Sequence, residues 1–89
     1  VYDHQIRLAR EAARHGRTVE ARVEAWIVIY QAEQQRDRPD AAIAALEAAI
    51  ADHPQVAHFR MAIARLLAET DRLPEGVEHL RWLTARYPD

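Results

Sequence analysis

Few side chains in this sequence are able to act as nucleophiles. Cysteine and serine are absent, and the only aliphatic hydroxyls belong to Thr18, Thr70 and Thr84. A hydrolase of the usual kind needs a nucleophile beside a base that a third group orients. Each threonine falls near a predicted helix end or on an exposed face. The serine and cysteine hydrolase arrangements therefore cannot be built, and we expect no enzymatic activity.

Histidines are the next candidates for chemistry. No two of them have the one-face spacing of a helical zinc site. His53 and His58 flank Pro54, and Asp52 would be a third ligand if they approached each other. The alternative is that His15 and His53 lie at helix C-termini, where positive charge is favoured. We favour that alternative and expect no metal, no cofactor and no catalytic residue. The histidines are His4, His15, His53, His58 and His79.

Composition indicates a small helical domain. The chain has 89 residues, a formal net charge of −2, and twelve basic residues that are all arginine. The charge argues against a dedicated nucleic-acid binder, and the arginine bias suggests a GC-rich bacterial source. No apolar run is long enough to span a membrane. Because the chain begins at Val1 rather than Met, we expect a piece of a longer protein. No leader opens this sequence, and it leaves the compartment unknown, bacterial cytoplasm or periplasm.

Apolar residues recur at three-and-four spacing in five stretches, which is typical of amphipathic helices. Thr18 has the side chain of an N-cap, Pro39 suits a first helical position, and Gly16 stands where a helix-ending glycine is preferred. In the last stretch we expect Val77, Leu80, Leu83 and Tyr87 to face inward. The predicted helices span 3–15, 19–36, 39–52, 55–69 and 74–87.

Four arginines share one face of the first predicted helix. This stripe would suit an anion or an acidic partner. The alternative, which we favour, is a solvated face on which Arg7 and Glu11 form an (i, i+4) ion pair. The four are Arg7, Arg10, Arg14 and Arg17.

The sequence also repeats itself with a period of 34 residues, and each unit contains two predicted helices. A fixed period of this length is the signature of a stacked helical repeat. The matching positions include Ile29 and Ile63, Asp37 and Asp71, Arg38 and Arg72, Leu46 and Leu80, and Pro54 and Pro88.

This unit resembles the tetratricopeptide repeat. The motif residues are Trp26, Ile29, Ala42, Leu46, Ala49 and Pro54 in the first copy, and Ile63, Gly76, Leu80, Leu83 and Pro88 in the second. Two residues depart from the motif: Tyr30 stands where a small residue is usual, and Arg60 replaces the large apolar residue that Trp26 supplies.

The resemblance implies an all-α fold of helical hairpin repeats stacked in a right-handed superhelix, an α-solenoid. We expect one domain over residues 1–89, with a flanking or capping helix at 1–17 and repeats at 23–56 and 57–89. It also implies close helix approach at Gly76 and Ala42.

The resemblance further implies a concave face that holds a partner protein or peptide. By motif position this face carries Glu24, Ile27, Val28, Gln31 and Gln34 from the first copy, and His58, Met61, Ala62 and Arg65 from the second. The family's carboxylate clamp uses lysine and asparagine, and both residues are absent here.

We therefore expect a non-catalytic protein-interaction scaffold, part of a larger bacterial assembly or secretion protein. The alternative is a structural spacer within a longer solenoid. Trp82, Leu83 and Tyr87 form a possible interface, because the last helix has one internal partner for many apolar residues. We expect self-association of the chain through this helix.

Overall fold

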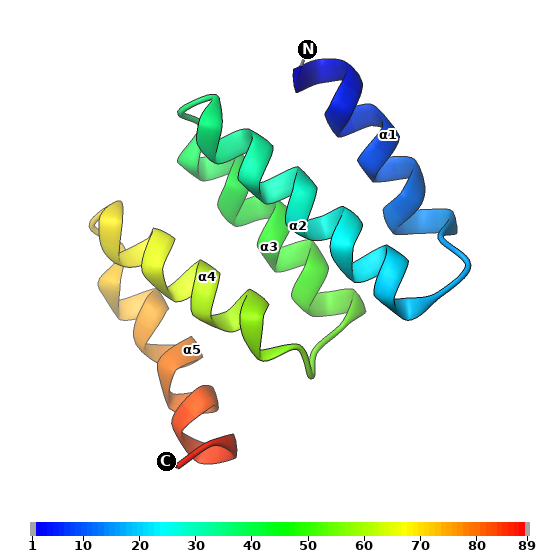
Figure 1. Ribbon diagram of the computed structural model, residues 1–89. Coiled ribbons are helices and arrows are strands. Elements are labelled where there is room, and N and C mark those ends of the chain that lie inside the picture. The colour runs from blue at the N-terminus through cyan, green and yellow to red at the C-terminus, as the bar shows by residue number, and fades with distance from the viewer. Residues whose placement is uncertain (1, 89) are drawn as a thin grey trace. The chain divides into compact units, whose positions relative to one another are not determined.

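The computed structural model describes residues 2–88, which form five helices joined by short turns (Figure 1). No strand occurs within this range. The predicted all-α fold is confirmed, and every helix boundary lies within two residues of its predicted position. The helices are α1 Tyr2–His15, α2 Val19–Gln35, α3 Pro39–Asp52, α4 Ala57–Glu69 and α5 Leu73–Arg86.

By its contacts the chain divides into two compact units, Val1–Ala45 and Leu46–Asp89. The division falls inside α3, so the first unit contains the α1–α2 pair and the second contains the α4–α5 pair. The expectation of one domain over residues 1–89 stays a prediction.

One core cluster of the first unit consists mainly of alanines. Ala9 and Ala13 of α1 pack with Ala25 and Ile29 of α2, and all four are buried. Trp26 is half-buried and packs against this cluster. Alanine at these positions leaves room for two helices to lie close together, as close-packed interiors require.

Side chains at the α1–α2 turn satisfy backbone groups that the helix ends leave free. Thr18 accepts a hydrogen bond from the Ala21 N–H at 3.0 Å, which confirms the predicted N-cap. The Arg22 guanidinium donates to the carbonyl oxygen of Gly16 at 2.7 Å. Gly16 ends α1, but without the positive φ of a left-handed cap. A Cβ there would lie 2.6 Å from the Ala12 carbonyl oxygen, so lack of space is what requires glycine.

The same turn follows α2 and α4, and it explains why aspartate recurs. Asp37 and Asp71 have φ angles of 57° and 60°, the left-handed conformation that ends many helices. The Arg38 N–H donates to the Glu33 carbonyl at 2.9 Å, and the Arg72 N–H donates to the Leu67 carbonyl at 2.7 Å. With the N–H groups of the two aspartates bonded to Gln34 and Ala68, both turns are Schellman motifs.

In the second unit α4 supplies most of the core. Its buried side chains are Phe59, Ala62, Ile63, Ala64, Leu66 and Leu67.

Gly76 of α5 is buried against this helix, which confirms the close approach expected there. A Cβ on Gly76 would lie 3.2 Å from the Ala64 carbonyl oxygen and 3.5 Å from the Leu67 Cβ. Ala42 is also fully buried. The close approach of another helix at Ala42 stays a prediction.

The predicted inward face of α5 is wrong in part. Val77 and Leu83 are half-buried, but Leu80 is 47% exposed and Tyr87 is 55% exposed. In this pair α5 packs on α4 along the line of Gly76. Side chains beside that line reach solvent, because one neighbouring helix covers only a narrow stripe.

Candidate functional site

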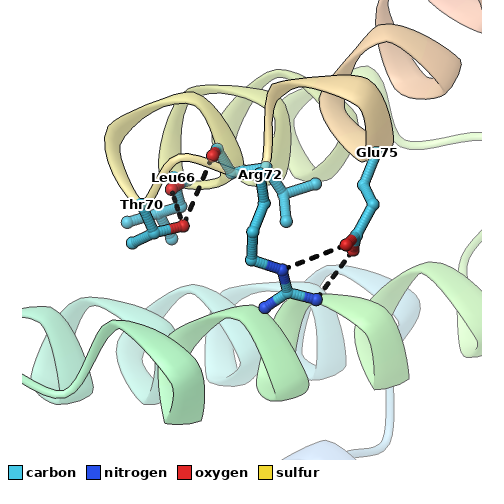
Figure 2. Close-up of polar contacts among 5 residues, drawn as sticks. Leu66, Thr70, Arg72 and Glu75 are labelled. Atoms are coloured by element: carbon cyan, nitrogen blue, oxygen red, sulfur yellow. Dashed lines mark hydrogen bonds and ion pairs between the residues drawn. The ribbon is translucent and has the colours of Figure 1, made fainter.

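The three threonine hydroxyls are engaged with backbone groups. Thr70 donates to the Leu66 carbonyl at 2.9 Å, as Figure 2 shows, and Thr84 donates to the Leu80 carbonyl at 2.9 Å. Thr18 caps α2. Their positions at helix ends and on helix surfaces match the structural roles that serine and threonine commonly have.

The candidate metal ligands are not brought together. The rings of His53 and His58 lie 6.5 and 6.2 Å from the ring of Phe59. Across residues 2–88 no group of three or more histidine, aspartate or glutamate side chains is placed to hold a metal ion. The set of Asp52, His53 and His58 is therefore not assembled.

Four of the predicted concave-face residues line one groove on α4. His58, Met61, Ala62 and Arg65 surround a volume of about 250 Å³. Met61 is 59% exposed, Arg65 and His58 are exposed, and Ala62 forms the buried floor. The four residues that the repeat motif indicated on α4 therefore line the same groove.

The predicted residues of α2 do not all share one hollow. Glu24 and Val28 line an open groove of about 380 Å³ together with Leu8 and other residues of α1. Gln31 is exposed, and Ile27 and Gln34 are half-buried outside that groove.

A third groove, which sequence reasoning missed, lies between α4 and α5. Its volume is about 390 Å³, and its lining is mainly apolar: Ala57 and Met61 from α4, and Leu83, Thr84 and Tyr87 from α5. The signal in the sequence was the (i, i+4) spacing of Ala57 and Met61 and of Leu83 and Tyr87, which places each pair on one helix face.

A family model described as Tetratricopeptide repeat matches residues 34–89. The chain belongs to the tetratricopeptide repeat family. The match runs from the end of α2 through α5 and includes the whole second repeat. Five helices without a strand among the described residues fit a helical repeat solenoid. Neither the comparison with curated proteins nor the comparison with solved structures gives a match.

Tetratricopeptide repeats generally mediate protein–protein interaction and are typically not catalytic. The predicted class, a protein-interaction repeat, is thereby confirmed at that level. No helix in the described part of the chain combines the length and apolarity needed to cross a membrane.

The second tetratricopeptide repeat accommodates its departure from the motif with cation–π contacts. The Arg60 guanidinium lies 4.5 Å from the centre of the Trp82 ring, and that of Arg86 lies 5.2 Å away. Such contacts attract a cation to the face of an aromatic ring. The three residues of the possible interface therefore lie in different surroundings: Trp82 is half-buried and contacts two arginines, whereas Leu83 and Tyr87 line the α4–α5 groove.

Beside this stack, Arg60 Nη1 and His79 Nδ1 are 3.4 Å apart. Burial lowers the pKa of His79, and the charge of Arg60 lowers it further. Glu47 and Glu78 act in the opposite direction without reversing the shift. Burial and the charge of Arg60 thus favour the neutral imidazole, the form that can accept a hydrogen bond from the guanidinium.

A bidentate ion pair fixes the start of α5 (Figure 2). Arg72 Nε and Nη2 donate to the two carboxylate oxygens of Glu75 at 3.2 and 2.7 Å. These hydrogen bonds lower the pKa of Glu75; burial acts in the opposite direction, and the charge of Arg72 lowers the pKa further. The pair is exposed, so its role is local: it holds the turn that precedes the second helix of the repeat.

The α1 stripe lacks the ion pair expected for it. Arg7, Arg10, Arg14 and Arg17 are all exposed, and none pairs with a carboxylate within residues 2–88. The missing pair with Glu11 accords with the small gain that an exposed ion pair gives.

Proposed function

We propose that this chain is a non-catalytic scaffold module that binds a segment of another protein on the concave face of its repeats. The proposal names two sets of residues: Glu24, Ile27, Val28, Gln31 and Gln34 on α2, and His58, Met61, Ala62 and Arg65 on α4. The single observation that supports it most is the groove shared by all four α4 residues.

The groove suits a protein partner. Met61 is an unbranched, adaptable apolar side chain of the kind often found at binding surfaces. Arg65 is exposed and able to form a bidentate pair with a carboxylate. An apolar centre with a polar rim is the usual arrangement of an interface.

A non-catalytic role is supported by the engagement of the threonine hydroxyls with backbone. A place in a larger bacterial assembly or secretion protein belongs to the same proposal and rests on composition alone.

The test is a quantitative capture experiment with the purified chain as bait. Met61→Ala and Arg65→Ala should each reduce the amount of partner retained, with little change in melting temperature because both side chains are exposed. Glu47→Gln and Glu78→Gln, also at exposed positions, are matched controls and should retain the partner.

Equal losses from both sets of variants would contradict a concave-face site. A structural spacer is the alternative function, and it predicts that no protein is retained above the level of an unrelated helical control.

A further inference from the structure

Met61 lines two grooves on the second repeat. It lines the α4 groove with His58, Ala62 and Arg65, and it lines the α4–α5 groove with Ala57, Leu83, Thr84 and Tyr87. The two hollows are therefore neighbours on one side of the second repeat, and a single bound segment would reach both.

The two grooves differ in chemistry. The walls of the α4–α5 groove are almost entirely apolar. Its Thr84 hydroxyl donates to the Leu80 carbonyl, so the donor on that wall is already used. A volume of about 390 Å³ falls within the range of pockets that take a ligand group. This hollow suits a large apolar side chain.

The α4 groove adds a positive charge, that of the exposed Arg65. Arg65 makes no ion pair with a carboxylate in the described part of the chain. The sequence contains no acidic residue from 55 to 68, or from 79 to 88. Glu69 follows Arg65 by one turn of α4, but the two side chains form no ion pair in the structure. Neither groove has an acidic lining residue. Because Arg65 has no carboxylate partner within residues 2–88, a negative charge on the bound segment would be complementary to it.

We propose that the bound segment is an acidic amphipathic peptide of a partner protein. One large apolar side chain fills the α4–α5 groove, and a nearby carboxylate pairs with Arg65. This inference rests on the proposed function and specifies the partner's chemistry. Leu83 and Tyr87 then bind the partner, rather than a second copy of this chain.

The test selects linear peptides from a random phage-displayed library against the purified chain. Enriched sequences should contain aspartate or glutamate within one or two helical turns of leucine, isoleucine, phenylalanine or methionine. Amide chemical-shift changes in the labelled chain should then include Met61, Arg65, Leu83 and Tyr87.

Variants measured with one enriched peptide separate the two contacts. Met61→Ala and Tyr87→Ala should each weaken binding about tenfold, the cost of losing a central apolar contact. Arg65→Glu should weaken binding several-fold, less so at high salt, and replacing the peptide's acidic residue by lysine should restore affinity for that variant.

Leu73→Ala and Arg38→Glu are matched controls, since both side chains are also exposed and neither lines any of the three grooves. They should leave the affinity unchanged.

Each other result contradicts the inference in a different way. Peptides that shift His58 and Arg65 but show no acidic or apolar preference leave the proposed function standing and refute the inference. Failure to enrich any peptide, or shifts that avoid α4, refute both. If light scattering shows a dimer that Met61→Glu converts to a monomer, the groove holds a second copy and the inference is wrong.

Discussion

Gly76 offers a direct test of how the second helical hairpin is packed. Glycine in a helix costs about 1 kcal/mol relative to alanine, so its presence inside α5 needs a reason. A left-handed backbone is not that reason, because no glycine in the described residues has a positive φ. The remaining explanation is proximity: a Cβ would meet the Ala64 carbonyl oxygen at 3.2 Å.

The size of the substituted side chain decides the sign of the effect. Gly76→Ala gains about 1 kcal/mol of helix propensity and loses part of it to the tight contact, so the net change should be under about 1 kcal/mol. Gly76→Leu adds three further carbon atoms toward α4, where Ala64 and Leu67 already lie. Overpacking of this kind costs about 1–3 kcal/mol, or roughly 4 °C or more in melting temperature for a domain of this size.

Thermal unfolding of the wild type, Gly76→Ala and Gly76→Leu, followed by circular dichroism, measures these changes in stability. Ala85→Leu, at an exposed position of the same helix, is the matched control and should change stability by less than about 0.5 kcal/mol. A Gly76→Leu protein that melts at or above the temperature of the wild type would refute the packing argument. So would equal losses for Gly76→Leu and Ala85→Leu.

Three further predictions concern single side chains. Asp71→Gly should raise the free energy of unfolding by about 0.5–1 kcal/mol, because the φ of 60° at this position suits glycine. Urea unfolding measures the change as a higher midpoint concentration, and a lower midpoint would contradict the prediction. In a Trp26→Phe background, Arg60→Ala should increase acrylamide quenching of Trp82, since the arginine covers its ring at 4.5 Å, and unchanged quenching would show that the contact is not maintained in solution. Because the pKa of His79 is lowered by burial and then by Arg60, the unfolded chain binds this proton at higher pH than the folded chain. Stability should therefore fall as the pH drops from about 7.5 to about 5.5, by less in His79→Gln, and an equal fall in both proteins would exclude His79 as the cause.

Local signals in the sequence were enough to predict the helices. Thr18 caps α2, and the Asp-Arg turns after α2 and α4 recur with the repeat. These signals work because each depends on atoms within a few residues of the chain. The close approach at Gly76 was also predictable, because a glycine inside a strongly helical stretch is costly unless space requires it.

Periodicity could not predict how many neighbours a helix has. The spacing of Leu80 and Tyr87 is the same whether a second helix covers them or solvent does, and the structure leaves both largely exposed. The residues of the α4 groove were selected by motif position on one helix, whereas the α4–α5 groove is lined by residues of two helices and depends on how these pack. The packing of two helices against each other cannot be predicted from the residue pattern of either helix alone.

The contrast between Trp26 and Arg60 shows what the repeat keeps constant. In the first copy the Trp26 ring packs against a cluster of small residues. At the same motif position in the second copy, a planar guanidinium lies over a tryptophan that α5 supplies instead. In each copy this position of the first helix carries a planar group, the Trp26 indole or the Arg60 guanidinium. A comparison of residue types scores Arg60 as a lost apolar contact. The structure shows a different contact in its place, because the planar guanidinium of arginine can stack on an aromatic ring.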